Sequence, residues 1–129
     1  MKALYEAMQT YFAATALAAQ VNGLWPGLAK QGTALPYLTF GLVSNDPGQT
    51  SDSWEERPLL QITVWSEELS PSQALMLADL LKQTFDNAKF AVIGYDLVTF
   101  VRVADRLIPD PDTGWEYSAD YRLFIGKPK

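Results

Sequence analysis

A regular alternation of apolar and polar residues runs from residue 57 to residue 65. Leu60, Ile62 and Val64 occupy every second position of this stretch. A period of two in mostly branched side chains predicts a strand with one face in the hydrophobic core. The positions between them are mixed in polarity, so we expect only one face of this strand to be fully buried.

A helix is expected soon after this strand. Ser70 is a natural N-cap, Pro71 suits the first helical position, and Gln73 can bond back to the cap. Apolar residues then recur at helical spacing, at Ala74, Leu77, Ala78, Leu81 and Phe85. The pattern predicts an amphipathic helix with this face against the core and Lys82 on the polar face.

An earlier helix is predicted for residues 2–21. Its apolar stripe is formed by Tyr5, Met8, Phe12, Ala16 and Ala19. The segment from Tyr11 to Ala19 carries no charge, and a helix that is apolar on all sides is buried on more than one side. Two interpretations stay open: the helix lies between the sheet and a loop, or its small-residue face packs on another subunit.

Three further strands are predicted, for residues 37–43, 97–108 and 115–125. The last has the cleanest alternation, with one face made of Trp115, Tyr117, Ala119, Tyr121, Leu123 and Ile125. Turn-forming residues fill positions 109–114, which predicts a hairpin between the final two strands. Residues 21–36 read as a connector with a turn at Trp25-Pro26-Gly27.

The longest polar stretch runs from Ser44 to Glu56 and shows no periodicity, so it is predicted to be a loop. Loops of this length in compact domains tend to be functional or disordered. Trp54 near its end is unusual for a solvated loop. It either packs back on the sheet or serves as an anchor for a partner, and the sequence favours neither.

Charge pairing predicts a register for the final hairpin. The expected pairs are Arg102 with Asp120, Arg106 with Glu116, Val101 with Tyr121 and Leu97 with Ile125. Opposite charges then share one face and apolar pairs the other, as cross-strand energetics prefer. Asp105 opposite Tyr117 is the mismatched pair in this register.

The expected order is helix, strand, strand, helix, strand, strand. This order predicts an α+β fold, with a mostly antiparallel four-stranded sheet and two helices packed on one face. A chain of 129 residues favours a single domain, which we assign to residues 1–129. About two-thirds of the unfolded surface can be buried at this size, enough for one core.

The amino-acid composition excludes several kinds of functional site. The chain has no cysteine, which excludes disulfides and thiolate sites, and no histidine, which excludes a serine–histidine triad. Its net charge is −5, and the 10 basic residues are scattered singly. A conventional nucleic-acid-binding surface is therefore not expected, because phosphate binding relies on clustered lysine and arginine.

Two groups of carboxylates are candidate sites. Asp105, Asp110 and Asp112 suggest calcium, but the sequence lacks the EF-hand spacing, and Asp-Pro-Asp-Thr-Gly is ordinary turn chemistry. The pairs Glu55-Glu56 and Glu67-Glu68 lack an apolar setting that would raise a pKa, and adjacent side chains point apart. We predict no catalytic residue, no cofactor and no metal site.

The first residues do not form a secretory signal, because Glu6 and Gln9 interrupt them before an apolar segment can develop. The uncharged segment from Tyr11 to Ala19 is too short to span a membrane. We therefore expect an intracellular protein without membrane association.

Several short sequence segments, in this order along the chain, resemble those of a known protein family. They are Leu-Pro-Tyr-Leu-Thr-Phe at 35–40, Gln-Ile-Thr-Val-Trp-Ser at 61–66, a Ser-x-x-x-Ala helix start at 70–74, and Asp-Tyr-Arg-Leu at 120–123. With the order of elements and the length, this pattern resembles the tail completion proteins of long-tailed bacteriophages and prophages. These proteins are also called tail terminators or tail-to-head joining proteins.

The resemblance implies a structural role without catalysis. Such proteins form a ring, typically a hexamer, that caps the tail tube, ends tail growth and makes the surface for the head connector. The implied partners are other copies of the chain, the tail tube protein and the head connector protein, and DNA passes through without specific binding. The implied location is the virion tail, and the bacterial host cytoplasm during assembly.

A ring needs two different patches that fit head to tail. Candidate interface residues are Tyr11, Phe12, Ala16, Trp54, Asp110, Asp112 and Trp115. They come from the uncharged segment, the polar stretch and the tip of the final hairpin.

Two other functions stay open: a different minor tail or head-completion component, and an unrelated α+β ligand-binding or enzyme domain. A concave pocket with convergent polar groups in a monomer would favour the last of these.

Overall fold

The computed structural model of the protein describes residues 2–49, 54–95, 97–110 and 114–125. Its elements, in order, are α1 (Lys2–Ala13), the 3₁₀ helix η1 (Ala16–Ala19), β1 (Leu24–Pro26), β2 (Tyr37–Gln49), β3 (Trp54–Ser66), α2 (Ser72–Phe85), β4 (Lys89–Ala91), β5 (Leu97–Asp110) and β6 (Gly114–Ile125). The described part of the chain is therefore mostly β.

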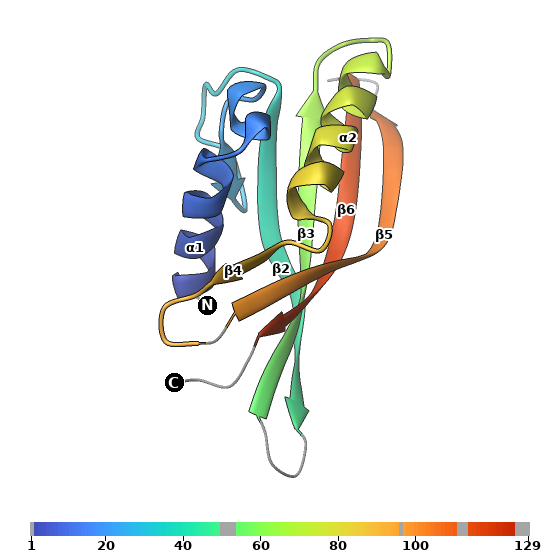
Figure 1. Ribbon diagram of the computed structural model, residues 1–129. Helices are drawn as coiled ribbons and strands as arrows, with labels where there is room; N and C mark the ends of the chain where they lie inside the picture. Colours follow the sequence, from blue (N-terminus) through green and yellow to red (C-terminus); the bar gives the residue numbers. More distant parts are fainter. Residues whose placement is uncertain (1, 50–53, 96, 111–113, 126–129) are drawn as a thin grey trace.

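One six-stranded sheet carries the fold, in the order β1-β2-β3-β6-β5-β4. β1 runs parallel to β2, and all other neighbours are antiparallel. The sheet is strongly curled, and α1 and α2 lie against the same side of it (Figure 1). The predicted four-stranded sheet and the predicted order of helix, strand, strand, helix, strand, strand are wrong, because the two edge strands were missed. Each has only three residues, too few for a hydrophobic period to be recognised.

The core fills the space between the helices and the sheet. Every residue of the predicted apolar face of α2 is buried. The inward residues of β3 and β6 are Leu60, Ile62, Val64, Tyr117, Ala119, Tyr121, Leu123 and Ile125, and all are buried as their alternation predicts. The strongest periodic signals in the sequence therefore mark the centre of the fold.

The first helix ends earlier than predicted. α1 stops at Ala13, and the uncharged segment turns before forming η1. Thr15 has an extended backbone, and its hydroxyl donates a 2.7 Å hydrogen bond to the carbonyl oxygen of Phe12. Such local bonds compete with helix continuation. The turn buries Leu17 completely and leaves Ala16 and Ala19 exposed, so the predicted stripe is correct only as far as Phe12.

The start of α2 also differs in detail. The N-cap position is occupied by Pro71, and Ser70, which was expected there, precedes it. Oγ of Ser70 accepts a 3.2 Å hydrogen bond from the backbone N–H of Ser72. Gln73 does not bond back to it. Instead, Oε1 of Gln73 accepts a 2.6 Å hydrogen bond from the hydroxyl of Ser66, the last residue of β3. The strand and the helix are thereby joined across their connecting turn.

The polar stretch from Ser44 to Glu56 is not a loop over its whole length. β2 continues to Gln49 and β3 begins at Trp54, and the two strands pair to their ends. The hairpin projects beyond the other strands (Figure 1). The stretch was predicted as a loop because its residues show no hydrophobic period.

The predicted register of the β5–β6 hairpin is wrong. Arg102 lies opposite Tyr121 rather than Asp120, and Arg106 lies opposite Ser118 rather than Glu116. The ladder contains an irregularity between Arg102 and Ala104, which is typical of a β-bulge. One extra residue in β5 at this point reverses which side chains face the core on either side of it. A prediction that uses one register for the whole hairpin cannot describe such a strand.

Candidate assembly surfaces

Two candidate interface residues on α1 have internal contacts. The ring of Tyr11 stacks on Phe90 with 4.7 Å between centroids, and its hydroxyl donates to the carbonyl oxygen of Thr84 at 2.5 Å. Phe12 is buried in the core. Tyr11 thus joins α1 to both α2 and β4. A direct contact of these residues with a partner stays a prediction, as it does for the exposed Ala16.

Trp115 fixes the turn between β3 and α2. Its indole N–H donates a 2.8 Å hydrogen bond to the carbonyl oxygen of Leu69. The preceding Gly114 has φ +119°, and a Cβ there would lie 2.6 Å from the carbonyl oxygen of Ser66 and 2.9 Å from that of Glu68. A side chain would not fit, so glycine allows the hairpin to approach the turn closely.

The remaining candidates lie where the structure is not described. Asp112 lies outside the described residues, and the side chains of Trp54 and Asp110 do as well. Trp54 begins β3 and is paired with Gln49, whereas Asp110 ends β5 and is paired with Gly114. The β2–β3 and β5–β6 hairpins lie at opposite ends of the sheet (Figure 1). The backbones of Trp54 and Asp110 therefore lie far apart on a single subunit.

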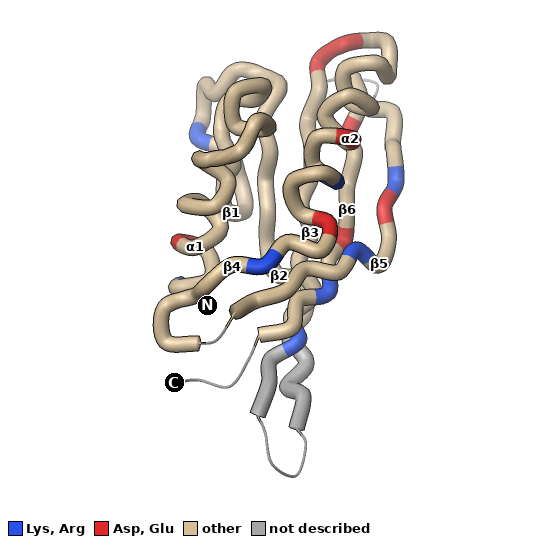
Figure 2. Tube along the Cα trace, viewed as in Figure 1, with Lys and Arg blue, Asp and Glu red and all other residues tan. Residues whose placement is uncertain are grey.

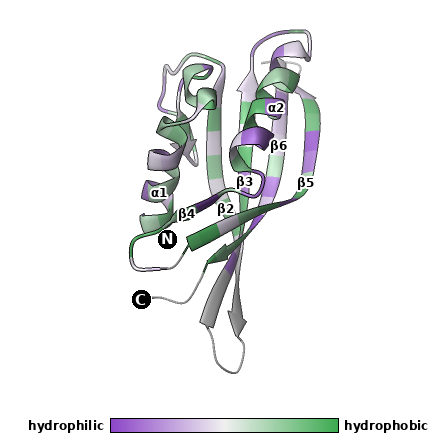
Figure 3. Ribbon diagram, in the orientation of Figure 1, coloured by the Kyte–Doolittle hydropathy of each residue, from purple (hydrophilic) through white to green (hydrophobic). Residues whose placement is uncertain are grey.

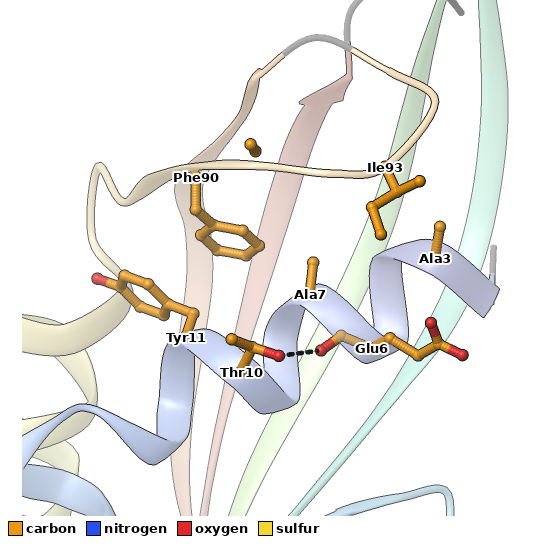
Figure 4. A pocket seen from close by; sticks show the side chains of 8 residues that line it. Ala3, Glu6, Ala7, Thr10, Tyr11, Phe90 and Ile93 are labelled. Atoms are coloured by element: carbon orange, nitrogen blue, oxygen red, sulfur yellow. Dashed lines mark hydrogen bonds between the residues drawn. The ribbon is translucent and has the colours of Figure 1, made fainter.

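A pocket of about 360 Å³ lies between α1 and β4 (Figure 4). Ala3, Ala7 and Tyr11 line it from the helix, and Phe90 and Ile93 line it from β4 and the turn that follows. Ile93 is 86% exposed. This pocket was not predicted from the sequence, because it depends on β4, a short strand that the hydrophobic pattern did not reveal.

A second apolar pocket, of about 620 Å³, lies between α1 and β1. Phe12, Ala13, Leu24 and Trp25 are among its lining residues. Neither this pocket nor the one beside β4 has a set of convergent polar groups like that of a typical small-molecule site. Both are better suited to receive apolar side chains.

A polar cluster connects α2 with β5 and β6. Asp86 accepts hydrogen bonds from the Tyr121 hydroxyl at 2.7 Å and from Nε of Arg102 at 3.1 Å. Asp105 accepts bonds from the Tyr117 hydroxyl at 2.6 Å and from Nη1 of Arg102 at 3.0 Å. Each carboxylate is thus paired with a cation and a phenol, which suits a structural network.

The pKa values within this cluster shift in opposite directions. The hydrogen bond from Tyr117 and the nearby cations lower the pKa of Asp105. Burial, followed by the hydrogen bonds to the carboxylates, raises the pKa values of Tyr117 and Tyr121 above the ordinary tyrosine value. At neutral pH the phenols are donors and the carboxylate is an acceptor, so the bonds are fully formed.

Acidic and basic residues lie close together on β5 and on α1, whereas the turn between β3 and α2 carries acidic residues alone (Figure 2). Glu67 and Glu68 are exposed on the β3–α2 turn, and Lys89 is exposed on β4.

Within the described ranges, no group of three or more histidine, cysteine, aspartate or glutamate residues could hold a metal ion. Among the same residues, neither helix has the length and apolarity needed to cross a membrane.

These features describe a small, mostly β module with surfaces suited to protein–protein contact. Comparison with known proteins gives the class. The family described as tail completion protein gp17 matches residues 2–125, so the chain belongs to the tail completion protein family and is a structural protein of phage-type tails. The resemblance seen in the sequence is thereby confirmed. No curated protein matches the chain.

A solved structure has a similar fold. It is a chain of the virion of a native gene transfer agent particle, with a TM-score of 0.74. Its sequence is 14% identical, and the match covers 98% of this chain and 95% of the other. At this identity the comparison concerns the fold, which is shared over nearly the whole length of both chains.

Proposed function

We propose that the protein assembles into a ring, typically a hexamer, that caps the phage tail tube. The ring ends tail growth and makes the surface to which the head joins. Its partners are further copies of itself, the tail tube protein and the head connector protein. It acts without catalysis in the virion tail, after assembly in the host cytoplasm.

The family match over residues 2–125 carries this proposal. The structure supports it through surface features that a single core does not need. Leu28, Leu69 and Ile93 are each more than four-fifths exposed, and two apolar pockets flank α1. Apolar surface that is gathered in one place, as in these pockets, is typical of sites that contact other proteins.

The charge of the chain fits passage of DNA without specific binding. The net charge is −5, and two of the arginines are paired with carboxylates, Arg102 with Asp86 at 3.1 Å and Arg106 with Asp120 at 3.3 Å. Binding to the DNA backbone would require lysines and arginines gathered on one surface. A lumen without such a surface lets DNA pass freely.

Tail tube polymerisation provides the test. Purified tube protein is polymerised with and without this chain, and tube lengths are measured by electron microscopy. The proposal predicts shorter tubes as the molar ratio of this chain rises, with a ring-shaped density at one end only. Unchanged tube lengths at saturating protein, with both ends bare, would contradict it.

A further inference from the structure

The turn between β3 and α2 is an unusual surface feature of the molecule. Leu69 at its centre is 93% exposed, and it directly follows the exposed carboxylates Glu67 and Glu68. We call these three residues the acidic turn. Because the Leu69 side chain is not buried within its own subunit, it contributes little to the stability of the folded monomer.

The acidic turn is nevertheless held rigidly. Trp115 donates its indole N–H to the carbonyl oxygen of Leu69 at 2.8 Å, and Gly114 lies directly against the backbone of the turn. From the other side, Ser66 is bonded to Gln73 at the start of α2. A side chain held in one place loses little conformational entropy on binding, so this turn is preorganised as an anchor.

The pocket between α1 and β4 is a complementary partner for this anchor. Ala3, Ala7, Phe90 and Ile93 give it an apolar lining, and its volume of about 360 Å³ exceeds the size of a leucine side chain. Figure 4 shows Ala7, Phe90 and Ile93 directed toward the space between the helix and the strand.

The charges around the two surfaces are complementary. Lys89 is exposed beside Phe90 on β4, and Lys2 precedes Ala3 on α1. Lys2 lies 3.7 Å from Glu6 in a largely exposed pair, which is a weak interaction. Among the described residues that line the pocket, Glu6 is the one with a charge, and Lys2 and Lys89 are next to lining residues in the chain. The acidic turn has two carboxylates. The pocket between α1 and β1 has no charged residue in its lining.

We propose that the acidic turn of one copy inserts Leu69 into the α1–β4 pocket of the next copy. The turn between β3 and α2 and the pair of elements α1 and β4 lie at different ends of the molecule (Figure 1), and the pocket lies between α1 and β4. A contact between two different patches is heterologous, and repeated head to tail it closes into a ring when the rotation allows. This inference rests on the ring of the proposed function and specifies its subunit contact.

The absence of cysteine from the chain permits a direct crosslinking test. A double variant, Leu69→Cys with Ala7→Cys, is oxidised at concentrations where the protein self-associates, with tail tubes present in a parallel sample. The contact predicts a ladder of covalent oligomers that disappears on reduction. Each single variant gives at most dimers, because one cysteine cannot extend a chain.

Matched variants locate the contact. Leu28→Cys with Ala7→Cys uses another exposed leucine, 87% exposed, and should give no ladder. Leu69→Cys with Ala13→Cys probes the α1–β1 pocket and should also give none. A ladder from either control in place of the predicted pair would overturn the assignment. Assembly by sedimentation without any ladder would overturn this contact and leave the ring intact, whereas no assembly in any sample would overturn both.

Truncation of the anchor gives an independent measure. Leu69→Ala should weaken self-association at least about tenfold, because it removes a leucine side chain buried on binding. Leu28→Ala should leave self-association unchanged. Both leucines are exposed in the monomer, so neither variant should alter its melting temperature. Equal self-association of the two variants would contradict the proposed role of Leu69.

Discussion

The hydroxyl of Tyr117 donates a 2.6 Å hydrogen bond to Oδ2 of Asp105, although the two residues are not opposite each other in the β5–β6 ladder. The same oxygen lies 3.0 Å from Nη1 of Arg102 and 3.7 Å from Nζ of Lys82. One carboxylate therefore connects β5, β6 and α2. It lies just beyond the irregularity in β5, where the register of the strand has shifted.

This bond predicts the effect of Tyr117→Phe. The substitution keeps the buried ring and removes only the donor, so it should lower the free energy of unfolding by about 1–2 kcal/mol. Urea denaturation measures the change. Tyr37→Phe is the control, because the Tyr37 hydroxyl has no hydrogen-bond partner among the described residues, and it should change stability by less than about 0.5 kcal/mol. Equal losses in the two variants would show that the bond contributes nothing specific.

The lowered pKa of Asp105 predicts a dependence of stability on acid. The hydrogen bond from Tyr117 is the largest cause, and the charges of Arg102 and Lys82 add to it. Because the folded-state pKa is below the unfolded value, the stabilisation is present above the unfolded value, about 4, and is lost as pH falls through the folded value. The effect is modest, since this side chain is 32% exposed.

Asp105→Asn tests this dependence. Unfolding free energies of the wild type and the variant are measured by urea denaturation between pH 7 and pH 3. The wild type should be more stable at pH 7, and the two should converge as the pH falls below about 4. A difference that does not change with pH would contradict an ionised Asp105 as the stabilising group.

The core face of α2 gives a prediction on stability. Leu81 is fully buried on the predicted apolar face, whereas Gln83 is exposed on the same helix. Leu81→Ala should cost about 2–5 kcal/mol, because it removes buried methyl groups and leaves a cavity. Gln83→Ala should change stability by less than about 0.5 kcal/mol. Similar urea midpoints for the two variants would be incompatible with the observed helix orientation.

The sequence predicted this face correctly because α2 packs one side on a core and exposes the other. β6 was equally clear, since its alternation continues from Tyr117 to Ile125 without interruption. In both elements one physical constraint, burial of a single face, acts on many residues in a row. Hydrophobic periodicity records that constraint directly.

The first half of β5 shows where this reasoning stops. Leu97, Val98, Phe100, Val101 and Val103 provide apolar residues for both faces, and Figure 3 shows this half of the strand coloured mostly hydrophobic. Either face could therefore have been assigned to the core. The irregularity before Ala104 settles the choice, with Val98 and Phe100 inside and Val101 outside, and charge pairing alone could not locate it.

The candidate surfaces were predicted less well than the core. Trp115 was selected as an exposed aromatic anchor, but its indole is used to fix the turn at Leu69. Leu69 is not among the interface residues predicted from the sequence. A leucine that is exposed by its tertiary setting has no distinguishing pattern in the sequence, because its neighbours in space come from β6.

Trp54 stays a predicted partner anchor. It lies at the end of the β2–β3 ladder, beyond Glu56, the first residue of β3 that pairs with β6. Trp54→Ala should leave the melting temperature nearly unchanged, because this end of the hairpin is remote from the buried residues of the core. It should weaken binding to tail tubes, since aromatic residues dominate many interfaces. Scanning calorimetry and tube cosedimentation measure the two effects, and a large fall in melting temperature with normal binding would assign Trp54 a role in the fold.

Sedimentation across concentration, with and without tail tubes, tests the central proposal most directly. Free chains should associate weakly and reversibly, because a terminator that closed into rings early could not dock in step with the finished tube. Added tubes should shift the chain into a tube-bound ring at concentrations where it is monomeric alone, as expected when binding favours the assembled state. A chain that is a strict monomer at every concentration and does not sediment with tubes would contradict the ring.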